Sequence, residues 1–554
     1  MKISGAKIVI ETLIENGVDT VFGYPGGAVL NIYDELYKNC DRIKHYTTSH
    51  EQGAAHAADG YARVSGKTGV VIATSGPGAT NLVTGIATAY LDSTPLVALT
   101  GNVATGLIGR DSFQEVDICG VTMPITKHNF MVKDINVLAD TIREAFKIAN
   151  SGRPGPVLID IPKDIQTAQT HFTPNKKEDF CKVYKNGVKA FNDAMQLIKE
   201  SKRPFIYAGG GVVISDASSE LSTFADTIDA PIGTSMMGLS AVSCDNERFL
   251  GMTGMHGRFA ASKALASCDL IIAVGTRFSD RATGNKTKFI HGKKVIHIDI
   301  DPAEIGKNIP AYVSLVGDVK KILSKLNANM QKIEREEWSK EVQSIKNSKD
   351  YHLEMDKSRL NPQSVIETVN KYADKDTIIA TDVGQHQMWV AQYYNFKKAR
   401  TFVTSGGLGT MGFGLGASIG ASIGAQKKAV LFTSDGGFHM NLNEMATLVS
   451  YNLPVLIVVM NNNALGMVRQ WQTLFFESRY SCTSLNRKTD YVMLAKAFGI
   501  NGCKIDDMSK LNNAVKDALK YNRPYLLEVT IDPDEKVLPM IPPNGTINDI
   551  ILKA

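Results

Sequence analysis

The sequence has few cysteines, and they form no pattern. Its 554 residues contain seven cysteines, scattered along the chain without a Cys-x-x-Cys pair. An odd, dispersed set of this kind excludes a disulfide framework and a zinc site, and it is typical of reduced thiols. We therefore expect a cytoplasmic protein.

The sequence also lacks a basic block, a signal peptide and a clear membrane span. Its 61 basic and 56 acidic residues leave a net charge of +5, so we expect no nucleic-acid partner. The N-terminal segment is amphipathic, with Glu11 and Glu15 inside its apolar pattern, which excludes a signal peptide. One uncharged run, residues 401–426, contains eight glycines. It therefore favours a packed loop and helix, and we expect no membrane segment.

The length predicts about three domains, because a single hydrophobic core rarely grows so large. Helical and strand patterns alternate in three regions, which predicts α/β domains with doubly wound parallel sheets. The three regions are residues 1–165, 190–322 and 361–532.

Three other segments are expected to connect or cover these domains. Residues 167–187 are polar and rich in Lys, which predicts a linker. Residues 320–350 are dense in Lys and Glu with apolar residues at helical spacing, which predicts a solvated connecting helix. The tail, residues 533–554, is rich in Pro and Gly, so we expect irregular structure that folds over a site as a lid.

The most informative stretch is residues 429–467. Two apolar runs, residues 429–432 and 455–460, predict parallel strands that are followed by Asp435 and by Asn462. Both side chains should meet at one edge of the sheet, where open α/β sheets bind ligands. Their oxygen atoms suit a hard cation such as Mg2+ that bridges to a diphosphate.

The spacing of this stretch is similar to the diphosphate motif of thiamine diphosphate (ThDP) enzymes. That motif begins Gly-Asp-Gly and ends Asn-Asn, and residues 437–460 supply the 24 positions between these ends. Ser434 replaces the first glycine. The departure is mild, because the backbone N–H groups that would hold phosphate remain. An ordinary βαβ unit with turn residues is the alternative.

A ThDP site also needs a carboxylic acid beside the aminopyrimidine ring, and Glu51 fits that need. It follows a short strand and precedes an Ala-rich helix with no other acid before Asp59. A buried glutamate there would relay the proton that activates the coenzyme. In isolation Glu51 is better explained as a carboxylate that the helix dipole favours. The diphosphate stretch favours the catalytic interpretation.

Several motifs in order along nearly the whole chain resemble the catalytic subunits of acetohydroxyacid synthases (acetolactate synthases). They lie at residues 22–27, 50–53, 74–81, 113–115, 153–157, 405–412, 465–471 and 537–542. The resemblance implies a pyrimidine-binding first domain, a central FAD-binding domain and a third domain that binds diphosphate and Mg2+.

The resemblance also implies roles for individual residues. Those implied to contact ThDP are Glu51, Gly384, Gln385, His386, Gly409, Met411, Asp435, Gly436, Gly437, Asn462 and Met467. Those implied to hold Mg2+ are Asp435, Asn462 and Ala464. Those implied to be catalytic are Glu51, Gln114 and Lys163, and those implied to line the substrate site are Phe113, Arg281 and Trp471. For Met411 and Met467 simple packing is the alternative, and for the exposed cations it is solvation.

The central region resembles the FAD-binding segments of the biosynthetic members. The implied FAD contacts are Arg153, Gly210, Ser235, Met236, His256, Gly275, Arg277, Asp299, Ile300, Asp318 and Val319. Glycines that follow a strand let the backbone approach a diphosphate. Ser279 departs by one acid from the family's Arg-Phe-Asp-Asp-Arg element. A domain without cofactor, whose glycines only make turns, is the alternative, and a flavin here would be chiefly structural.

The activity that the resemblance implies is a decarboxylating carboligation. Pyruvate would lose CO2, and its two-carbon unit would join pyruvate or 2-oxobutanoate to give 2-acetolactate or 2-aceto-2-hydroxybutanoate. This is the start of valine, leucine and isoleucine synthesis. The resemblance further implies a homodimer or homotetramer with active sites at the dimer interface, and a separate small regulatory subunit.

Other functions remain open at this point. Within the ThDP enzymes they are catabolic acetolactate synthase and relatives of pyruvate oxidase or decarboxylase, whereas Glu51 disfavours glyoxylate carboligase. Residues 407–412 also spell Gly-x-Gly-x-x-Gly, with Asp435 lying 23 residues beyond Gly412, which is typical of a nicotinamide-dependent dehydrogenase. Two glycines follow Asp435 at once, however, and favour its use as a metal ligand. A non-catalytic binding protein would not need Glu51, Asp435 and Asn462 together.

Overall fold

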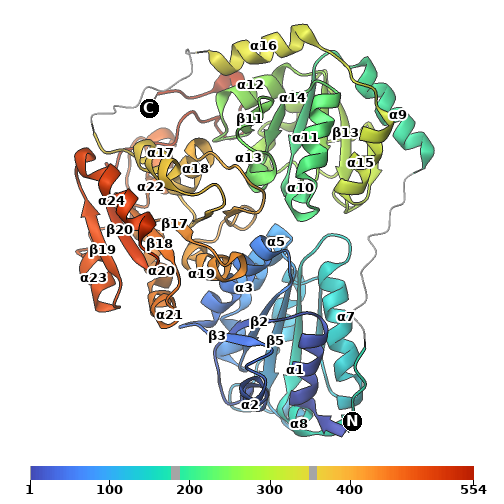
Figure 1. The fold of residues 1–554 in the computed structure, drawn as a ribbon, viewed down its shortest axis with the longest axis vertical. Coiled ribbons are helices and arrows are strands. Elements are labelled where there is room, and N and C mark those ends of the chain that lie inside the picture. Colours follow the sequence, from blue (N-terminus) through green and yellow to red (C-terminus); the bar gives the residue numbers. More distant parts are fainter. Residues whose placement is uncertain (1, 176–186, 349–358, 554) are drawn as a thin grey trace.

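The computed structural model describes residues 2–175, 187–348 and 359–553. These residues form three α/β domains, each built on a six-stranded sheet (Figure 1). All neighbouring strands within the three sheets run parallel. Helices cover both faces of each sheet, which confirms three doubly wound domains.

The first domain has the strand order β3-β2-β4-β5-β7-β6. Its strands are β2 (Thr20–Gly23), β3 (Lys44–Thr47), β4 (Gly69–Ala73), β5 (Leu96–Asn102), β6 (His128–Met131) and β7 (Pro156–Pro162). Its helices are α1 (Gly5–Glu15), α2 (Leu30–Lys38), α3 (Glu51–Ser65), α4 (Pro77–Thr80), α5 (Val83–Asp92), α6 (Ile118–Thr122), α7 (Leu138–Asn150) and α8 (Lys163–Thr167). The central strands are wholly buried because apolar side chains point to both faces.

The middle domain has the strand order β11-β10-β9-β12-β13-β14. Its strands are β9 (Pro204–Ala208), β10 (Ile232–Thr234), β11 (Phe249–Met252), β12 (Leu270–Val274), β13 (Lys294–Asp299) and β14 (Val313–Val316). Its helices are α9 (Val188–Glu200), α10 (Gly210–Ile214), α11 (Ser218–Thr227), α12 (Phe259–Ser267), α13 (Asp280–Thr283), α14 (Lys286–Ile290), α15 (Val319–Asn329) and α16 (Glu336–Asn347).

The third domain has the strand order β16-β15-β17-β18-β20-β19. Its strands are β15 (Ile378–Thr381), β16 (Phe402–Val403), β17 (Ala429–Ser434), β18 (Val455–Asn461), β19 (Asn501–Ile505) and β20 (Tyr525–Thr530). Its helices are α17 (Pro362–Tyr372), α18 (Gln385–Tyr393), α19 (Phe413–Ala425), α20 (Asp435–Asn441), α21 (Met445–Ser450), α22 (Gly466–Phe475), α23 (Tyr491–Ala497) and α24 (Met508–Lys520).

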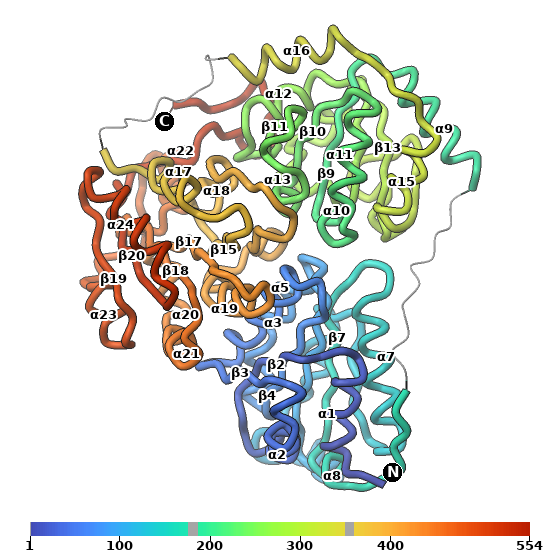
Figure 2. The backbone as a smooth tube through the Cα atoms, in the orientation of Figure 1, coloured from blue at the N-terminus to red at the C-terminus, as the bar shows by residue number. Residues whose placement is uncertain are grey.

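Helices α3 and α19 lie side by side and join the first domain to the third (Figure 2). Their contact faces are built from alanine and glycine, so the two backbones approach closely. A Cβ atom at Gly60 would overlap the carbonyl oxygen of Ala417, and one at Gly420 would overlap that of Ala57. Only glycine fits at these two positions, and the two helices form one tightly packed pair.

Two of the expected connections differ in the structure. The expected linker starts too early, because β8 (Gln169–His171) pairs with β1 (Lys2–Ser4) in a small antiparallel sheet of the first domain. The rest of that linker includes residues 176–186, which lie outside the described residues. The single connecting helix is wrong: α15 ends at Asn329 and α16 begins at Glu336.

The break between α15 and α16 has a tertiary cause. The guanidinium group of Arg335 donates hydrogen bonds to the carbonyl oxygens of Ile198, Ser201 and Ile228 in the middle domain. A helix that continued through residues 330–335 would lose these contacts. The remainder of the expected helix, residues 349–350, lies outside the described residues.

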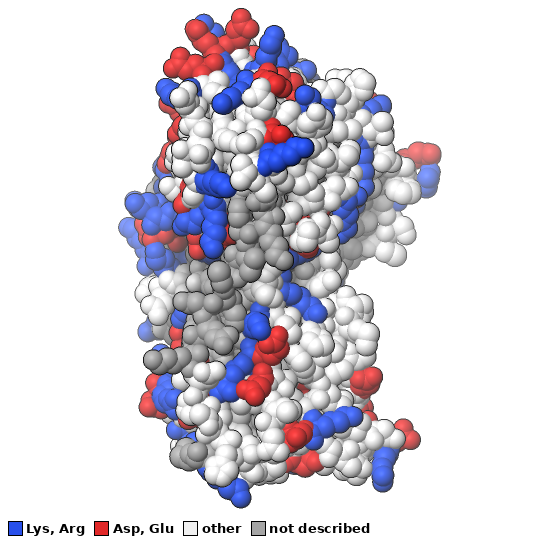
Figure 3. Space-filling view, turned by 90° about the vertical axis from the view of Figure 1, so that its right-hand side faces the viewer, with Lys and Arg blue, Asp and Glu red and all other residues white. Residues whose placement is uncertain are grey.

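The surface charge and the helix lengths complete the description of the fold. Basic and acidic side chains are interspersed on the face shown in Figure 3. Among the described residues, no helix combines the length and the apolar character needed to cross a bilayer, and this includes the glycine-rich α19.

Candidate active site

Asp435 lies where the sequence predicts it, at the carboxyl end of the third-domain sheet. Strands β17 and β18 pair in parallel with Ser434 opposite Met460, so Asp435 and Asn461 come next to each other at one sheet edge. The Asp435 side chain is buried, and neither carboxylate oxygen has a hydrogen-bond partner among the described residues. Burial raises its pKa to about 6. A buried carboxylate without partners is costly unless a cation binds there.

The loop after β18 supplies the second oxygen donor. Asn462 is buried, and its Oδ1 accepts a hydrogen bond of 3.1 Å from the N–H of Ala464. The N–H of Leu465 donates to the carbonyl of Thr483 at 2.8 Å and fixes the loop. No cluster of three or more His, Cys, Asp or Glu in the described part of the chain resembles a metal site made of side chains alone. One carboxylate, one amide and backbone carbonyls fit Mg2+, which keeps places for phosphate oxygens.

The residues after β15 form the neighbouring part of this edge. His386 is buried, its Nε2 has no partner among the described residues, and burial lowers its pKa to about 3. It is therefore a neutral imidazole with a single N–H, which faces an anion when Nε2 carries the proton. Gln385, by contrast, already donates to Gln470 Oε1 (3.0 Å) and to the carbonyl of Glu535 (2.8 Å).

The loop between β16 and α19 contains Gly409 and Met411. Asp382, the residue after β15, accepts hydrogen bonds from the N–H groups of Gly412 (2.9 Å) and Gly414 (3.2 Å). Burial raises the pKa of Asp382 to about 6. Gly409 has a φ of +70° and is exposed, so its carbonyl is free to face a ligand. Asp382 thus fixes the C-terminal end of this loop, whereas Gly409 in the middle of the loop remains exposed to solvent.

Glu51 begins α3, as the sequence predicts. It is 9% exposed, and its Oε2 accepts a hydrogen bond of 2.9 Å from Asn81. The N–H of Ser49 donates to the Glu444 carboxylate at 3.1 Å. Glu444 lies just beyond the carboxyl end of α20, whereas Asp435 begins that helix. In the described residues no hydrogen bond or ion pair joins Glu51 to Asp435.

Among the other predicted first-domain residues, Gln114 lies near this region, whereas in the described part of the chain no hydrogen bond or ion pair joins Phe113 or Lys163 to Glu51. Gly78 is close to the Glu51 carboxylate, and Gly76 lies against the backbone of Gln114, which has a φ of +58°. Phe113, next to Gln114, is 86% exposed. Lys163 is exposed at the start of α8.

The predicted FAD residues lie mainly at the carboxyl edge of the middle-domain sheet. Gly210 follows β9, Gly275 follows β12, and the two turns touch: the N–H of Gly211 donates to the carbonyl of Gly275 at 3.0 Å. A Cβ atom at Gly211 would lie 2.7 Å from the Cα of Gly275. The others at this edge are Ser235 and Met236 after β10, Asp299 and Ile300 at β13, and Asp318 and Val319 after β14. Close approach of these turns requires glycine.

Two arginines lie at this edge, and only one of them is paired with acids among the described residues. Arg153 donates to Ser93 Oγ (2.7 Å) and Glu304 Oε1 (2.9 Å). The Arg277 side chain has no hydrogen bond or ion pair with any described residue, and its pKa is lowered first by burial and then by the charge of Arg153. A half-buried guanidinium group without a partner, beside a second one, suits a phosphate-bearing ligand. Burial also raises the pKa of Asp299 to about 6 and lowers that of His256 to about 4.

Arg281 and Trp471 come together, although they belong to different domains. The guanidinium carbon of Arg281 lies 5.5 Å from the centroid of the Trp471 ring. The tail runs beside them, because the N–H of Ile541 donates to the carbonyl of Met255 at 2.8 Å. Apart from a short 3-10 turn (Ile547–Asp549) and a bridge between Met540 and Ile551, the described tail is irregular.

Comparison with known proteins agrees with this geometry. Three family descriptions match: "Thiamine pyrophosphate enzyme, N-terminal TPP binding domain" at residues 3–121, "central domain" at residues 191–326, and "C-terminal TPP binding domain" at residues 382–529. A "Probable acetolactate synthase large subunit" from Methanocaldococcus jannaschii is 46% identical, and the match covers 99% of this chain and 95% of that protein.

Two bacterial relatives agree with the archaeal one. The "Acetolactate synthase large subunit" of Corynebacterium glutamicum is 45% identical over 99% of this chain and 90% of that protein. The "Acetolactate synthase isozyme 2 large subunit" of Escherichia coli is 43% identical over 99% of this chain and all of that protein. The chain belongs to the acetolactate synthase large-subunit family. Membership confirms the resemblance and the ThDP-enzyme fold, and it excludes the dehydrogenase interpretation of residues 407–412.

Two acidic residues of this acetolactate synthase family member escaped the sequence analysis. Asp382 holds the loop that contains Gly409, and Glu444 holds the start of α3. Asp382 had a usable signal, since it follows a strand as Asp435 does. Glu444 had none, because its partner Ser49 is 395 residues away.

Proposed function

We propose that the protein is a ThDP- and Mg2+-dependent acetolactate synthase that decarboxylates pyruvate and transfers the two-carbon unit to pyruvate or 2-oxobutanoate. The buried carboxylate of Asp435, which has no side-chain partner among the described residues and lies at the same sheet edge as Asn462, carries this proposal. An unsatisfied carboxylate and an amide oxygen at one sheet edge suit a metal-bound diphosphate.

The third-domain residues would bind the metal ion and the coenzyme. Asp435, Asn462 and the carbonyl of Ala464 would hold Mg2+, and His386 would donate an N–H to the diphosphate. Gly409 would accept a hydrogen bond from the coenzyme's amino group. When bound, ThDP supplies the electron sink for decarboxylation and transfer. The remaining apolar contacts would come from Met411 and Met467.

Glu51 would hold the proton at the ring end of the coenzyme. Its carboxyl group is nearly buried, accepts only the Asn81 amide among the hydrogen bonds found, and lies at the start of a helix. Gln114 and Lys163 would act near the same end, and Arg281 would pair with the carboxylate of a 2-oxo acid beside Trp471.

We further propose at least a homodimer with shared active sites. In the described residues of one chain no hydrogen bond or ion pair joins Glu51 to Asp435, so a second copy would bring its Glu51 to this Asp435. Four large apolar side chains within residues 107–123 are exposed, which supports an interface at this surface: Leu107, Phe113, Val121 and Met123. A small regulatory subunit, a tetrameric assembly and a cytoplasmic location belong to the same proposal.

FAD in the middle domain is a separate part of the proposal. The partnerless Arg277, its neighbour Arg153 and the touching glycine turns fit a dinucleotide with a diphosphate. The flavin would be structural, since the carboligation involves no net redox change.

A product assay on the wild type and on Glu51→Gln tests the proposed function. With ThDP, Mg2+, FAD and pyruvate, the wild type should form 2-acetolactate, and added 2-oxobutanoate should divert product to 2-aceto-2-hydroxybutanoate. Glu51→Gln should reduce the rate by about 10²- to 10⁴-fold, the usual contribution of a positioned acid or base. Undiminished product formation by the variant would refute the role of Glu51, and reduction of NAD+ in place of CO2 release would refute the function.

A further inference from the structure

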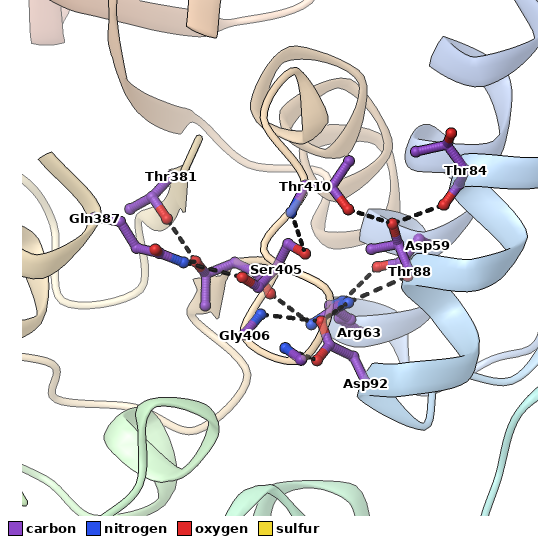
Figure 4. A network of polar contacts seen from close by, with 12 residues as sticks. Asp59, Arg63, Thr84, Thr88, Asp92, Thr381, Gln387, Ser405, Gly406 and Thr410 are labelled. Carbon is purple, nitrogen blue, oxygen red and sulfur yellow. Dashed lines mark hydrogen bonds and ion pairs between the residues drawn. The ribbon is translucent and has the colours of Figure 1, made fainter. Parts of the chain in front are cut away.

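A buried charged cluster lies between the first and third domains, away from the proposed contacts with coenzyme (Figure 4). Arg63, near the end of α3, makes ion pairs with Asp59 of the same helix and with Asp92 at the end of α5. The side chains of both aspartates are fully buried, and that of Arg63 is 10% exposed. The Arg63 guanidinium carbon also lies 5.3 Å from the centroid of the Phe413 ring on α19.

This cluster forms hydrogen bonds with the first residues of the third-domain loop that contains Gly409. Arg63 Nη1 donates to the carbonyl of Thr404 at 2.8 Å. The Asp92 carboxylate accepts hydrogen bonds from the N–H groups of Gly406 (3.2 Å) and Gly407 (2.7 Å). A Cβ atom at Gly407 would lie 2.8 Å from Asp92 Oδ1, so the carboxylate reaches these amides because glycine leaves room.

The far side of the same loop is held by a second first-domain group. Thr88 on α5 donates its hydroxyl to the carbonyl of Thr84 at 2.8 Å, so the 2.7 Å contact with Thr410 is a hydrogen bond from the Thr410 hydroxyl. Both hydroxyls are buried. The first domain therefore holds the loop on both sides of Leu408 and Gly409, which make no hydrogen bond to that domain in the described part of the chain.

Stability alone is a weak explanation for this cluster. Burying charges costs desolvation energy that the ion pairs often only offset, and apolar side chains of similar size stabilise as well. The charged groups instead fix the orientation of the side chains and of the loop backbone, because each carboxylate oxygen and guanidinium nitrogen faces a defined partner. Asp92 divides its oxygens between Arg63 and the backbone of Gly406 and Gly407, whereas Asp59 pairs with Arg63 and makes no contact with the loop.

We propose that Asp92, oriented by Arg63, is a positioning residue for the coenzyme: it holds residues 404–410 so that the Gly409 carbonyl stands where ThDP binds. The inference rests on the proposed function, which assigns Gly409 to the coenzyme. Asp92 touches neither substrate nor coenzyme in this proposal. Its loss should therefore weaken ThDP binding through the loop, while the pyruvate site formed by Arg281 and Trp471 stays intact.

Asp92→Asn is the test variant, and Asp59→Asn is its matched control. Both remove one buried carboxylate from Arg63, but only the first places an amide N–H2 against one of the two N–H groups of Gly406 and Gly407, whichever way the amide is turned. Calorimetric titration of the cofactor-free protein with ThDP in excess Mg2+ should give a Kd raised about 10- to 100-fold for Asp92→Asn, as for other groups that orient a binding residue. Asp59→Asn should bind ThDP within about threefold of the wild type.

Two further measurements separate positioning from general damage. At saturating ThDP, the KM of Asp92→Asn for pyruvate should match that of the wild type, whereas the ThDP concentration needed for half-maximal rate should rise with Kd. If Asp92→Asn does not fold, Gly407→Ala takes its place, because its methyl group pushes the loop off Asp92 while the charged cluster remains.

The outcomes are distinct. The inference is overturned if Asp92→Asn, or Gly407→Ala in its place, binds ThDP with wild-type affinity. It is also overturned if Asp59→Asn loses as much affinity as Asp92→Asn. A wild type that binds no ThDP overturns the proposed function instead.

Discussion

The Arg281 guanidinium lies over the face of the Trp471 ring, at 5.5 Å from the ring centroid, and so joins the middle domain to α22 of the third. The Arg281 side chain remains 62% exposed. The aromatic face fixes the direction of a long side chain while leaving its N–H groups available. This arrangement suits recognition of a small carboxylate at a domain boundary.

The first prediction concerns this pair. Arg281→Gln should raise the KM for pyruvate roughly 10- to 100-fold, because a charge-assisted hydrogen bond contributes about 1.5–3 kcal/mol. Arg281→Lys should recover part of the loss, since it keeps the charge but not the stacking on Trp471. Initial rates against pyruvate concentration measure both. ThDP affinity should stay at the wild-type value, and a parallel loss of ThDP binding would contradict the assignment.

The second prediction concerns Asp435 and separates binding from stability. Asp435→Asn should weaken Mg2+-dependent ThDP binding by roughly 10- to 100-fold, because the variant lacks the charge for the cation. The cofactor-free variant should nevertheless melt at a higher temperature, since a buried, unsatisfied carboxylate costs about 1–3 kcal/mol. Titration calorimetry and thermal unfolding without ligand check the two effects. A lower melting temperature would show that the carboxylate has a structural partner.

The third prediction uses the pKa of His56, which packs between α3 and Phe413. Burial lowers this pKa from 6.5 to about 3. The unfolded chain therefore takes up the proton first, so the contribution of His56 to stability is complete above pH 6.5 and falls as the pH falls toward 3. Between pH 7.5 and pH 5.0 the wild type should lose about 2 kcal/mol more than His56→Gln. Urea unfolding of the cofactor-free proteins at both pH values measures this difference, and equal losses would contradict it.

The fourth prediction concerns the contact between α3 and α19. Gly420→Ala should destabilise the protein by about 1–3 kcal/mol or more, because the new methyl group meets the carbonyl of Ala57 and a packed backbone cannot move aside. Gly106→Ala is the control, since no heavy atom lies within 4 Å of its added Cβ. In thermal unfolding experiments Gly420→Ala should have a lower melting temperature than the wild type, and Gly106→Ala should have the wild-type value. A wild-type melting temperature for Gly420→Ala would mean that the helices have room to separate.

The sequence patterns predict the parts of the fold that depend on local features. Strands β4, β12 and β17 are continuous apolar runs, and Asp435 was predicted because it follows one of them at a recognisable spacing. Strand β6, with the sequence His-Asn-Phe-Met, gives no such signal, because it is short, polar and only partly buried.

Other features depend on contacts between distant residues. The break before α16 arises from Arg335 reaching carbonyl oxygens more than a hundred residues earlier. In the sequence, Asp92 is an ordinary residue at the end of a helix. Only the fold brings its carboxylate to Gly406 and Gly407, which are 314 and 315 residues away. Periodicity and spacing report a residue's neighbours in sequence, so they contain no signal for such contacts.

The interlocked backbones of α3 and α19 bear on how relatives of this enzyme can be recombined. Glu51 begins α3, Arg63 lies near its end, and the carbonyl of Ala57 lies against Gly420 between them. A chimera that takes residues 51–65 from one parent and residues 413–425 from another would clash by a methyl group wherever a parent has alanine in place of Gly60 or Gly420. Crossover points should therefore keep both segments from the same parent, even though some 350 residues separate them in the gene.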